Sequence, residues 1–382
     1  MCAAVHMNIL CVSHLRWHFV FQRPQHLLSR AAKTGSVLYV EEPIIGDGPA
    51  HMQVTADSTG VLVAVPHLPA GLTTAEHVTW QRRLLADAIA RYLPGEFVVW
   101  FYTPMALGFT HDLDAAAVVY DCMDELSAFA GAPPELQHFE RELFKKSDVV
   151  FTGGQTLYEA KRSSHANVHA FPSSVDVAHF ARARRIKSVP ADQAAIPSPR
   201  IGFFGVIDER MDYDLLRGVA AARPDWNLVL LGPTAKVDPA ALPRAANIHY
   251  LGPKSYAELP NYIAGWDVAM LPFARNDATR YISPTKTPEY LAAGKPVVST
   301  SIRDVVRPYG QQGLARIADT VADFEAAVEA ALAEESVGRL RAADAFLTHM
   351  SWDGTWLRMR QLVEQAIDER KSRGDRHARS AS

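Results

Sequence analysis

Short apolar runs alternate with segments of helical periodicity along most of this chain. The runs are rich in β-branched and aromatic residues and predict strands at 8–13, 36–41, 61–65, 97–101, 117–121, 148–152, 200–205, 227–231, 247–251, 267–271 and 296–300. Helical periodicity occurs at 23–32, 75–92, 135–146, 214–222, 256–264, 287–293, 321–332 and 352–368. Uniformly apolar strands that alternate with helices are typical of parallel sheets covered on both faces. The pattern therefore predicts an α/β protein.

The alternation stops at residues 190–199 and then restarts. This stretch holds Pro190, Pro197 and Pro199 and no convincing element, as is typical of a linker. We expect two doubly wound, Rossmann-like domains, 1–190 and 198–350, a closing helix at 351–368 that crosses back to the first domain, and a disordered basic tail at 369–382. Ligands of such sheets bind beyond the carboxyl ends of the strands, so we expect the site in a cleft between the domains.

Charge and cysteine content exclude several classes of function. Lys plus Arg (39) nearly balances Asp plus Glu (42), so no surface for nucleic acid is expected. Cys2, Cys11 and Cys122 are too few and too scattered for a disulfide framework or a zinc site, which favours a reducing, cytoplasmic location. The 15 histidines lack ligand spacing, and we predict no metal. No apolar stretch approaches the roughly 18 residues of a membrane span, although peripheral contact with the inner membrane stays open.

The strongest chemical signal lies at residues 283–298. A proline near its start and a glycine near its end predict where a helix begins and ends. Ser283, Thr285 and Lys286 then lie at the helix N-terminus, where free amides and the helix dipole favour a phosphate. Glu289 lies one turn later on the same face and is placed to accept hydrogen bonds from ribose hydroxyls. The alternative is a capped surface helix with an incidental Lys286–Glu289 pair.

The segment from Glu289 onward resembles the nucleotide-sugar site of GT-B glycosyltransferases, above all glycosyltransferase family 4. Further segments resemble the same family in the same order, at 171–180, 201–207, 247–253, 259–272 and 351–352. The resemblance implies an enzyme with two Rossmann-like domains facing a cleft. It would transfer a sugar from a nucleotide-diphosphate sugar, with UDP favoured, to a saccharide or lipid-linked acceptor in cell-surface or exopolysaccharide synthesis, without metal or another cofactor.

The donor side departs from the family at two points. Tyr281 stands where the family has a glutamate that contacts the donor sugar, which leaves the sugar and the retaining or inverting course open. In the loop that begins at Gly205, Val206 replaces a phosphate-binding arginine. Arg210 falls near the family's lysine and is the candidate for a second cationic phosphate contact. Its alternative role is that of an exposed loop arginine beside Asp208 and Asp212.

The acceptor side is expected at the carboxyl ends of two strands in the first half. His14, Arg16 and Arg23 follow the first strand in a segment that resembles bacterial cell-surface polysaccharide glycosyltransferases, and we expect them to bind the acceptor. Asp121 ends an apolar strand and Asp124 follows it. One of them would be the base of an inverting reaction or an acceptor-positioning group of a retaining one. The alternative role for either is a helix N-cap.

Two other functions stay open at this point. A sugar-nucleotide epimerase with the same fold would bind the same donor and use no acceptor. A catalytically silent sugar-nucleotide-binding protein would explain the departures at Val206 and Tyr281. The oligomeric state is not predicted.

Overall fold

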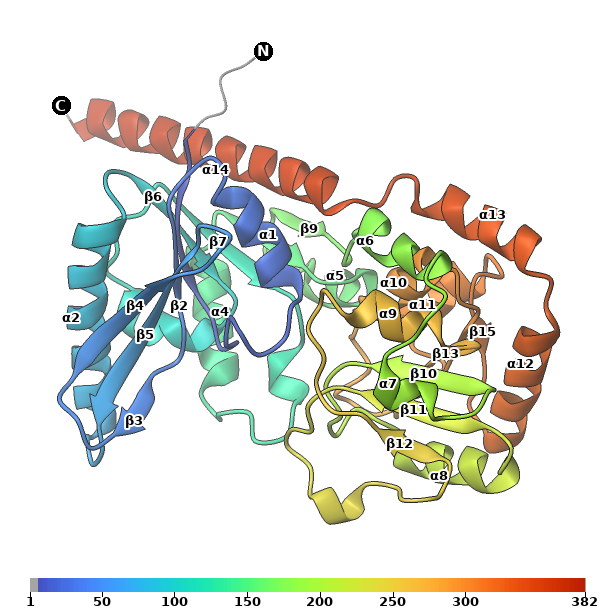
Figure 1. Cartoon of the computed structure of the whole chain (residues 1–382). Helices are drawn as coiled ribbons and strands as arrows, with labels where there is room; N and C mark the ends of the chain where they lie inside the picture. Colours follow the sequence, from blue (N-terminus) through green and yellow to red (C-terminus); the bar gives the residue numbers. More distant parts are fainter. Residues whose placement is uncertain (1–5, 382) are drawn as a thin grey trace. The chain divides into compact units, whose positions relative to one another are not determined.

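The computed structural model describes residues 6–381, with side chains described up to residue 373, and Cys2 lies outside this range. The chain divides into two compact units (Figure 1). The first holds the residues up to Phe171 together with those from Asp353 onward, and the second is Pro172–Trp352. The division thus falls before the proline-rich stretch at 190–199. The reason is that Phe180 and Ile196, on either side of Pro190, are buried in the core of the second unit.

The first unit is built on a nine-stranded sheet with the order β3-β5-β2-β1-β6-β7-β8-β9, and β4 pairs with β5. Its strands are β1 Asn8–Val12, β2 Val37–Val40, β3 Ile44–Gly46, β4 His51–Ala56, β5 Leu62–Pro69, β6 Phe97–Phe101, β7 Ala117–Cys122, β8 Val149–Thr152 and β9 Val168–Ala170. All pairs are parallel except β4–β5. The apolar runs predict the buried strands correctly, whereas β3 and most of β4 are exposed and lack such a run.

Helices connect and cover these strands. They are α1 Arg23–Ala31, α2 Thr74–Tyr92, α3 Leu107–Thr110, α4 Leu136–Lys146, α5 Gln155–Lys161 and α14 Trp352–Ala381, with 3-10 turns η1 Pro104–Ala106 and η2 Leu126–Ala128. The start of α2 is fixed by a capping box, in which the Glu76 amide donates to Thr73 Oγ1 and the Thr73 amide donates to Glu76 Oε2. Among the described helices, none combines the length and the apolar character needed to cross a membrane.

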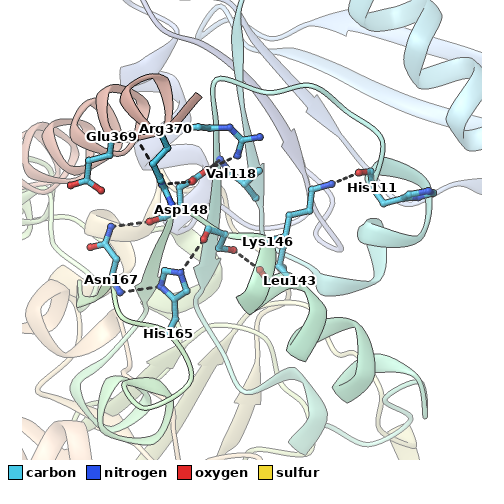
Figure 2. Close-up of polar contacts among 11 residues, drawn as sticks. His111, Val118, Leu143, Lys146, Asp148, His165, Asn167, Glu369 and Arg370 are labelled. Carbon is cyan, nitrogen blue, oxygen red and sulfur yellow. Dashed lines mark hydrogen bonds and ion pairs between the residues drawn. The ribbon is translucent and has the colours of Figure 1, made fainter. Parts of the chain in front are cut away.

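The last helix, α14, differs from the expectation at its far end. The sequence predicts a disordered basic tail from residue 369, but the helix continues to Ala381. Basic residues of this segment have acidic partners in the first unit: Arg370 and Arg373 pair with Asp148 at 2.9 and 3.2 Å, and Lys371 pairs with Glu96. Figure 2 shows Asp148 between Arg370 and the backbone of Val118. These ion pairs attach the end of α14 to the first unit. The sequence pattern does not reveal them, because the partners are far apart in sequence.

The second unit has a six-stranded parallel sheet with the order β12-β11-β10-β13-β14-β15. Its strands are β10 Arg200–Phe204, β11 Asn227–Leu231, β12 Ile248–Tyr250, β13 Val268–Leu271, β14 Val297–Ser299 and β15 Arg316–Ile317. This is the strand order of a Rossmann fold, in which the connections reverse direction beside β10. The predicted class, two Rossmann-like α/β domains, is confirmed.

The helices of the second unit are α6 Val177–Ala181, α7 Ala191–Ala194, α8 Tyr213–Ala222, α9 Leu259–Ala264, α10 Lys286–Ala292, α11 Arg303–Val305, α12 Val321–Ala333 and α13 Ser336–Leu347. Shorter turns are η3 Arg182–Arg184, η4 Pro239–Ala241 and η5 Val306–Gly310. Gln193 in α7 bonds to the Tyr262 carbonyl and to the Trp266 indole. Residues of the expected linker are therefore part of this unit.

Candidate functional site

Two of the predicted donor residues, Gly205 and Lys286, meet at the carboxyl end of β10, beside which the strand connections of the second unit reverse direction. Gly205 follows this strand with a φ of 142°, which favours glycine. A Cβ at this position would lie 2.3 Å from Lys286 Cε and 2.8 Å from Lys286 Nζ. The Lys286 ammonium also lies 5.7 Å from the centre of the Phe203 ring. Glycine at 205 therefore lets a positive charge approach the backbone at the end of β10.

Glu289 lies one turn into α10 and is 6% exposed. Its Oε2 is buried and has no hydrogen-bond partner within the described residues. Burial raises the pKa of Glu289 to about 8, against the opposing effect of the Lys286 ammonium. A buried carboxyl oxygen without a partner is costly in a folded protein and is available to a hydroxyl donor from a ligand.

Arg210 and Tyr281 each contact a charged neighbour in their own segment. The Arg210 guanidinium forms an ion pair with Asp208, with a shortest distance of 2.6 Å, although the Arg210 carbonyl accepts a bond from the amide of Ala274, in the segment between β13 and α10. The ring of Tyr281 lies 5.3 Å from the Arg280 guanidinium. This geometry matches the alternative that the sequence left open for Arg210, a loop arginine held by Asp208.

Ser283 and Thr285 are partly buried in the segment that leads into α10. Thr285 is the N-cap residue, but its side chain makes no capping bond to the helix. The helix begins at Lys286, as its proline and glycine signals predict to within a residue. The first turn thus presents Lys286 and Glu289 together, with Thr285 directly before them.

In the first unit, two predicted residues contact each other in the interior. Arg23 is 1% exposed and Asp121 is fully buried. Arg23 Nε lies 3.0 and 3.1 Å from the two Asp121 carboxylate oxygens, and Arg23 Nη1 donates to the Phe171 carbonyl at 2.6 Å. This arrangement favours a structural role for the pair, in place of acceptor binding by Arg23 and proton abstraction by Asp121.

The remaining acceptor candidates lie in the segments after β1 and β7. Arg16 donates to Glu41 Oε2 at 2.8 Å and to the Glu42 carbonyl at 2.6 Å, and its side chain is 39% exposed. His14 and Asp124 are partly buried. Because both segments follow parallel strands of one sheet, they lie at the same sheet edge. Arg16, His14 and Asp124 keep the exposure that a contact with an acceptor requires.

Two charged groups of this edge are missed by the sequence reasoning. Glu41 directly follows β2 and binds both Arg16 and the amide of Trp17. Lys161 ends α5 and pairs with Glu125 and Glu140. A signal existed for Glu41, since a carboxylate that directly follows an apolar strand commonly faces a site, as was argued for Asp121. No local signal marks Lys161, because its partners are far away in sequence.

No group of three or more His, Cys, Asp or Glu side chains within the described residues is placed to hold a metal ion. Cys11 and Cys122 are both buried free thiols. Burial raises the pKa of each thiol above its ordinary value, so neither has the character of a reactive thiolate.

A comparison with protein families finds a match in the second unit, which holds the predicted donor residues. Residues 198–334 match the family model described as "Glycosyl transferases group 1". A curated relative from Bacillus subtilis (strain 168), TuaH, is named for a glycosyltransferase of teichuronic acid biosynthesis. It is 26% identical over 238 residues, which are 57% of this chain and 59% of the relative. The match thus spans less than two thirds of that relative's length.

Solved structures share the fold over almost the whole chain. Sucrose-phosphate synthase from Thermosynechococcus elongatus has a TM-score of 0.70 at 13% identity, with 95% of this chain and 100% of that chain covered. A trehalose-6-phosphate protein from E. coli bound with UDP-2-fluoro glucose has a TM-score of 0.66 at 12% identity, with 94% and 99% covered. HepE from Anabaena in complex with UDP and glucose has a TM-score of 0.64 at 12% identity, with 94% of this chain and 100% of that chain covered.

These similarities agree with the Rossmann-like strand order of the second unit, in which the connections reverse direction beside β10. The family match also includes α10, where Lys286 and Glu289 lie. The predicted resemblance to GT-B glycosyltransferases is confirmed. Residues 198–334 match the glycosyl transferases group 1 family, and the chain as a whole has the GT-B fold of glycosyltransferases.

Proposed function

We propose that the protein is a glycosyltransferase that moves a sugar from a nucleotide-diphosphate sugar to a saccharide or lipid-linked acceptor in cell-surface or exopolysaccharide synthesis. One observation carries the proposal: Lys286 and Glu289 lie together on the first turn of α10, inside the segment that matches the family, with Glu289 Oε2 buried and unpartnered. An ammonium and a hydrogen-bond acceptor one turn apart suit the diphosphate and the ribose of one nucleotide.

In this proposal the leaving diphosphate is neutralised by the protein rather than by a metal ion. The Lys286 ammonium and the backbone amides of 283–286 would bind the phosphate oxygens, where negative charge grows as the glycosidic bond breaks. Glu289 would accept bonds from the ribose hydroxyls and so fix the nucleotide relative to Lys286. Arg210 would add a second positive charge only by exchanging Asp208 for a phosphate, because Asp208 holds its guanidinium.

The nature of both substrates is proposed from the relatives. Two of the similar structures hold UDP or a UDP-sugar, which supports a UDP-sugar donor. TuaH is named for teichuronic acid biosynthesis, which supports a polysaccharide acceptor. A lipid-linked acceptor would bring the protein to the inner face of the cell membrane. On the acceptor side we assign the polar contact to Asp124, with His14 and Arg16 beside the acceptor, because Asp121 is occupied by Arg23.

The test replaces Lys286 by alanine and compares it with Lys187→Ala, an exposed lysine of the same unit. Both variants and the wild type are incubated with labelled UDP- and GDP-sugars and a lipid-linked acceptor. Loss of a charge-assisted phosphate contact worth about 1.5–3 kcal/mol should lower kcat/KM by roughly 10- to 100-fold in Lys286→Ala and leave Lys187→Ala unchanged. Transfer that is insensitive to Lys286→Ala would remove the donor site from this position.

The same assay separates the alternatives. Conversion of the donor to an isomer without any acceptor would identify an epimerase. Donor binding with neither transfer nor isomerisation would identify a silent binding protein. The family match and the named relatives favour transfer over both.

A further inference from the structure

The segment after β7, residues 123–128, carries Asp124. We refer to it as the β7 loop. The backbone of its first residue, Met123, packs against Gly153. A Cβ on Gly153, at the end of β8, would lie 2.3 Å from the Met123 carbonyl oxygen and 2.8 Å from Met123 Cα. The Gly153 amide also donates to the Cys122 carbonyl at 2.9 Å. The glycine pair that follows β8 thus serves the close approach of two backbone segments.

Glu125, two residues further along the β7 loop, is held by a shielded ion triad. Lys161 Nζ lies 2.7 Å from Glu125 Oε2 and 2.8 Å from Glu140 Oε2. The three side chains are only 11%, 14% and 15% exposed, in the order Lys161, Glu125, Glu140. Glu125 Oε1 accepts a further bond from Ser127 at 2.7 Å. Lys161 therefore ties the β7 loop to two helices, α4 through Glu140 and α5 through its own backbone.

The charges of the triad make Lys161 indispensable to this arrangement. Burial by itself disfavours the ammonium, but the carboxylates of Glu140 and Glu125 outweigh it and raise the pKa of Lys161 above its ordinary range. Without the ammonium, two shielded carboxylates would face each other and repel. Glu140 also accepts a bond from the Tyr120 hydroxyl of β7 at 2.9 Å, whereas the second donor of Glu125, Ser127, lies in the β7 loop itself and moves with it. The β7 loop is the part that would move.

We propose that Lys161 is a positioning residue of the acceptor side, which sets the place of Asp124 by holding Glu125 and with it the β7 loop. The inference rests on the proposed glycosyltransferase function for its catalytic consequence. Its structural half, the order of the β7 loop, stands apart from that function and is measured separately.

The experiment uses the full chain with Lys161→Met, Lys161→Arg and Glu125→Gln. The matched control is Lys145→Met, which removes a lysine whose side chain is 71% exposed and which pairs with Glu142 on α4. Hydrogen exchange of the amides of 123–128 is followed together with transfer kinetics. We expect exchange of the β7 loop to rise at least tenfold in Lys161→Met, to return toward the wild-type rate in Lys161→Arg, and to stay unchanged in Lys145→Met.

In kinetics, a displaced Asp124 should lower kcat/KM for the acceptor by about 10- to 100-fold in Lys161→Met, while the dissociation constant of a UDP-sugar stays within about twofold. Glu125→Gln keeps the shape of the side chain and loses its charge, so a smaller fall of the same kind is expected if Lys161→Met does not fold. A role limited to stability predicts lower melting temperatures with wild-type loop exchange and an unchanged acceptor KM, and that result overturns the proposal.

Failure of the proposed function is recognised independently. A wild type that transfers no sugar to any acceptor contradicts the glycosyltransferase assignment, and the exchange of 123–128 still decides whether Lys161 holds the loop. Rapid exchange of this loop in the wild type, equal to that in Lys161→Met, contradicts the positioning role whatever the activity.

Discussion

Two buried carboxyl groups, one in each unit, have opposite surroundings. Asp121 in the first unit is fully buried, and both of its oxygens contact the Arg23 guanidinium. Glu289 in the second unit is 6% exposed, and its Oε2 has no hydrogen-bond partner among the described residues. Both lie near the carboxyl end of a parallel strand, where α/β proteins place their sites. The sequence marks both as candidates, and only the contacts separate them.

The difference teaches which of the two is available to a ligand. A buried charge that is paired and hydrogen-bonded belongs to the structure, and removal of one partner strands the other. Burial raises the pKa of a carboxyl group that has no hydrogen-bond partner, and such a group destabilises the fold. Shifted pKa values of this kind are common at functional sites. The contacts of Asp121 thus support a structural role in the first unit, and the unpartnered oxygen of Glu289 supports the donor site that we propose.

The largest loss of stability is expected when the buried Arg23–Asp121 ion pair is broken. Arg23→Met leaves Asp121 buried without a partner and should lower the free energy of unfolding by about 3–5 kcal/mol. The control is Arg30→Met on the same helix, since Arg30 pairs with an Asp353 that is 79% exposed and should contribute at most about 1 kcal/mol. Urea unfolding measures both. Equal, small losses in the two variants would show that the buried pair is no more important than a surface one.

The unpaired group is tested through pH. The pKa of Glu289 is raised to about 8 in the folded state, from an ordinary value of 4.5. The folded chain then binds a proton that the unfolded chain has lost, so this group lowers stability as pH rises from about 4.5 to about 8. Glu289→Gln should remove a pH-dependent loss on the order of 5 kcal/mol across this range.

The control for this experiment is Glu335→Gln, which alters an exposed carboxylate of the same unit. Donor binding gives a second measurement. The ionised carboxylate accepts bonds from the ribose hydroxyls more strongly than the neutral acid does, so UDP-sugar affinity should rise from pH 6 to pH 8 in the wild type and stay flat in Glu289→Gln. Parallel profiles for the two proteins would mean that Glu289 has a partner in solution.

The smallest loss of stability is expected from the partly exposed ion pairs between Asp148 and the end of α14. Asp148→Asn keeps the oxygen that accepts from the Val118 amide but weakens the ion pairs with Arg370 and Arg373 (Figure 2). We expect a loss of about 1 kcal/mol and faster hydrogen exchange at the end of α14. Glu96→Gln, which affects the more exposed Glu96–Lys371 pair, should change neither quantity. Slow exchange in both variants would show that other contacts hold the helix end.

Most of the fold follows from patterns that are local in sequence. Apolar runs mark the buried strands, and the proline and glycine of segment 283–298 bracket α10, because strand burial and helix ends depend on neighbouring residues. The edge strands β3 and β4 and the order of residues 369–381 depend on contacts with distant segments, such as Arg370 with Asp148. Local patterns do not contain that information.

The candidate site divides in the same way. Lys286 and Glu289 are three residues apart on one helix, so their joint position is predictable from periodicity. The partners of Arg23 and Arg16 are set by folding and lie 98 and 25 residues away in sequence, whereas Asp208 stands two residues from Arg210. A motif can therefore say which side chains reach the end of a strand, but not which of them are already occupied.

The division of the chain has a consequence for synthesis on the ribosome. The first unit needs residues from Asp353 onward, whereas the second unit is one continuous segment. Trp356, Met359, Val363 and Ala366 of α14 are all buried. The second unit can thus complete its core while the first, although made earlier, waits with the apolar surface around Trp100 uncovered until the last helix emerges. A nascent chain of this kind folds out of order, and early termination near residue 350 would leave a finished second unit attached to an unfinished first one.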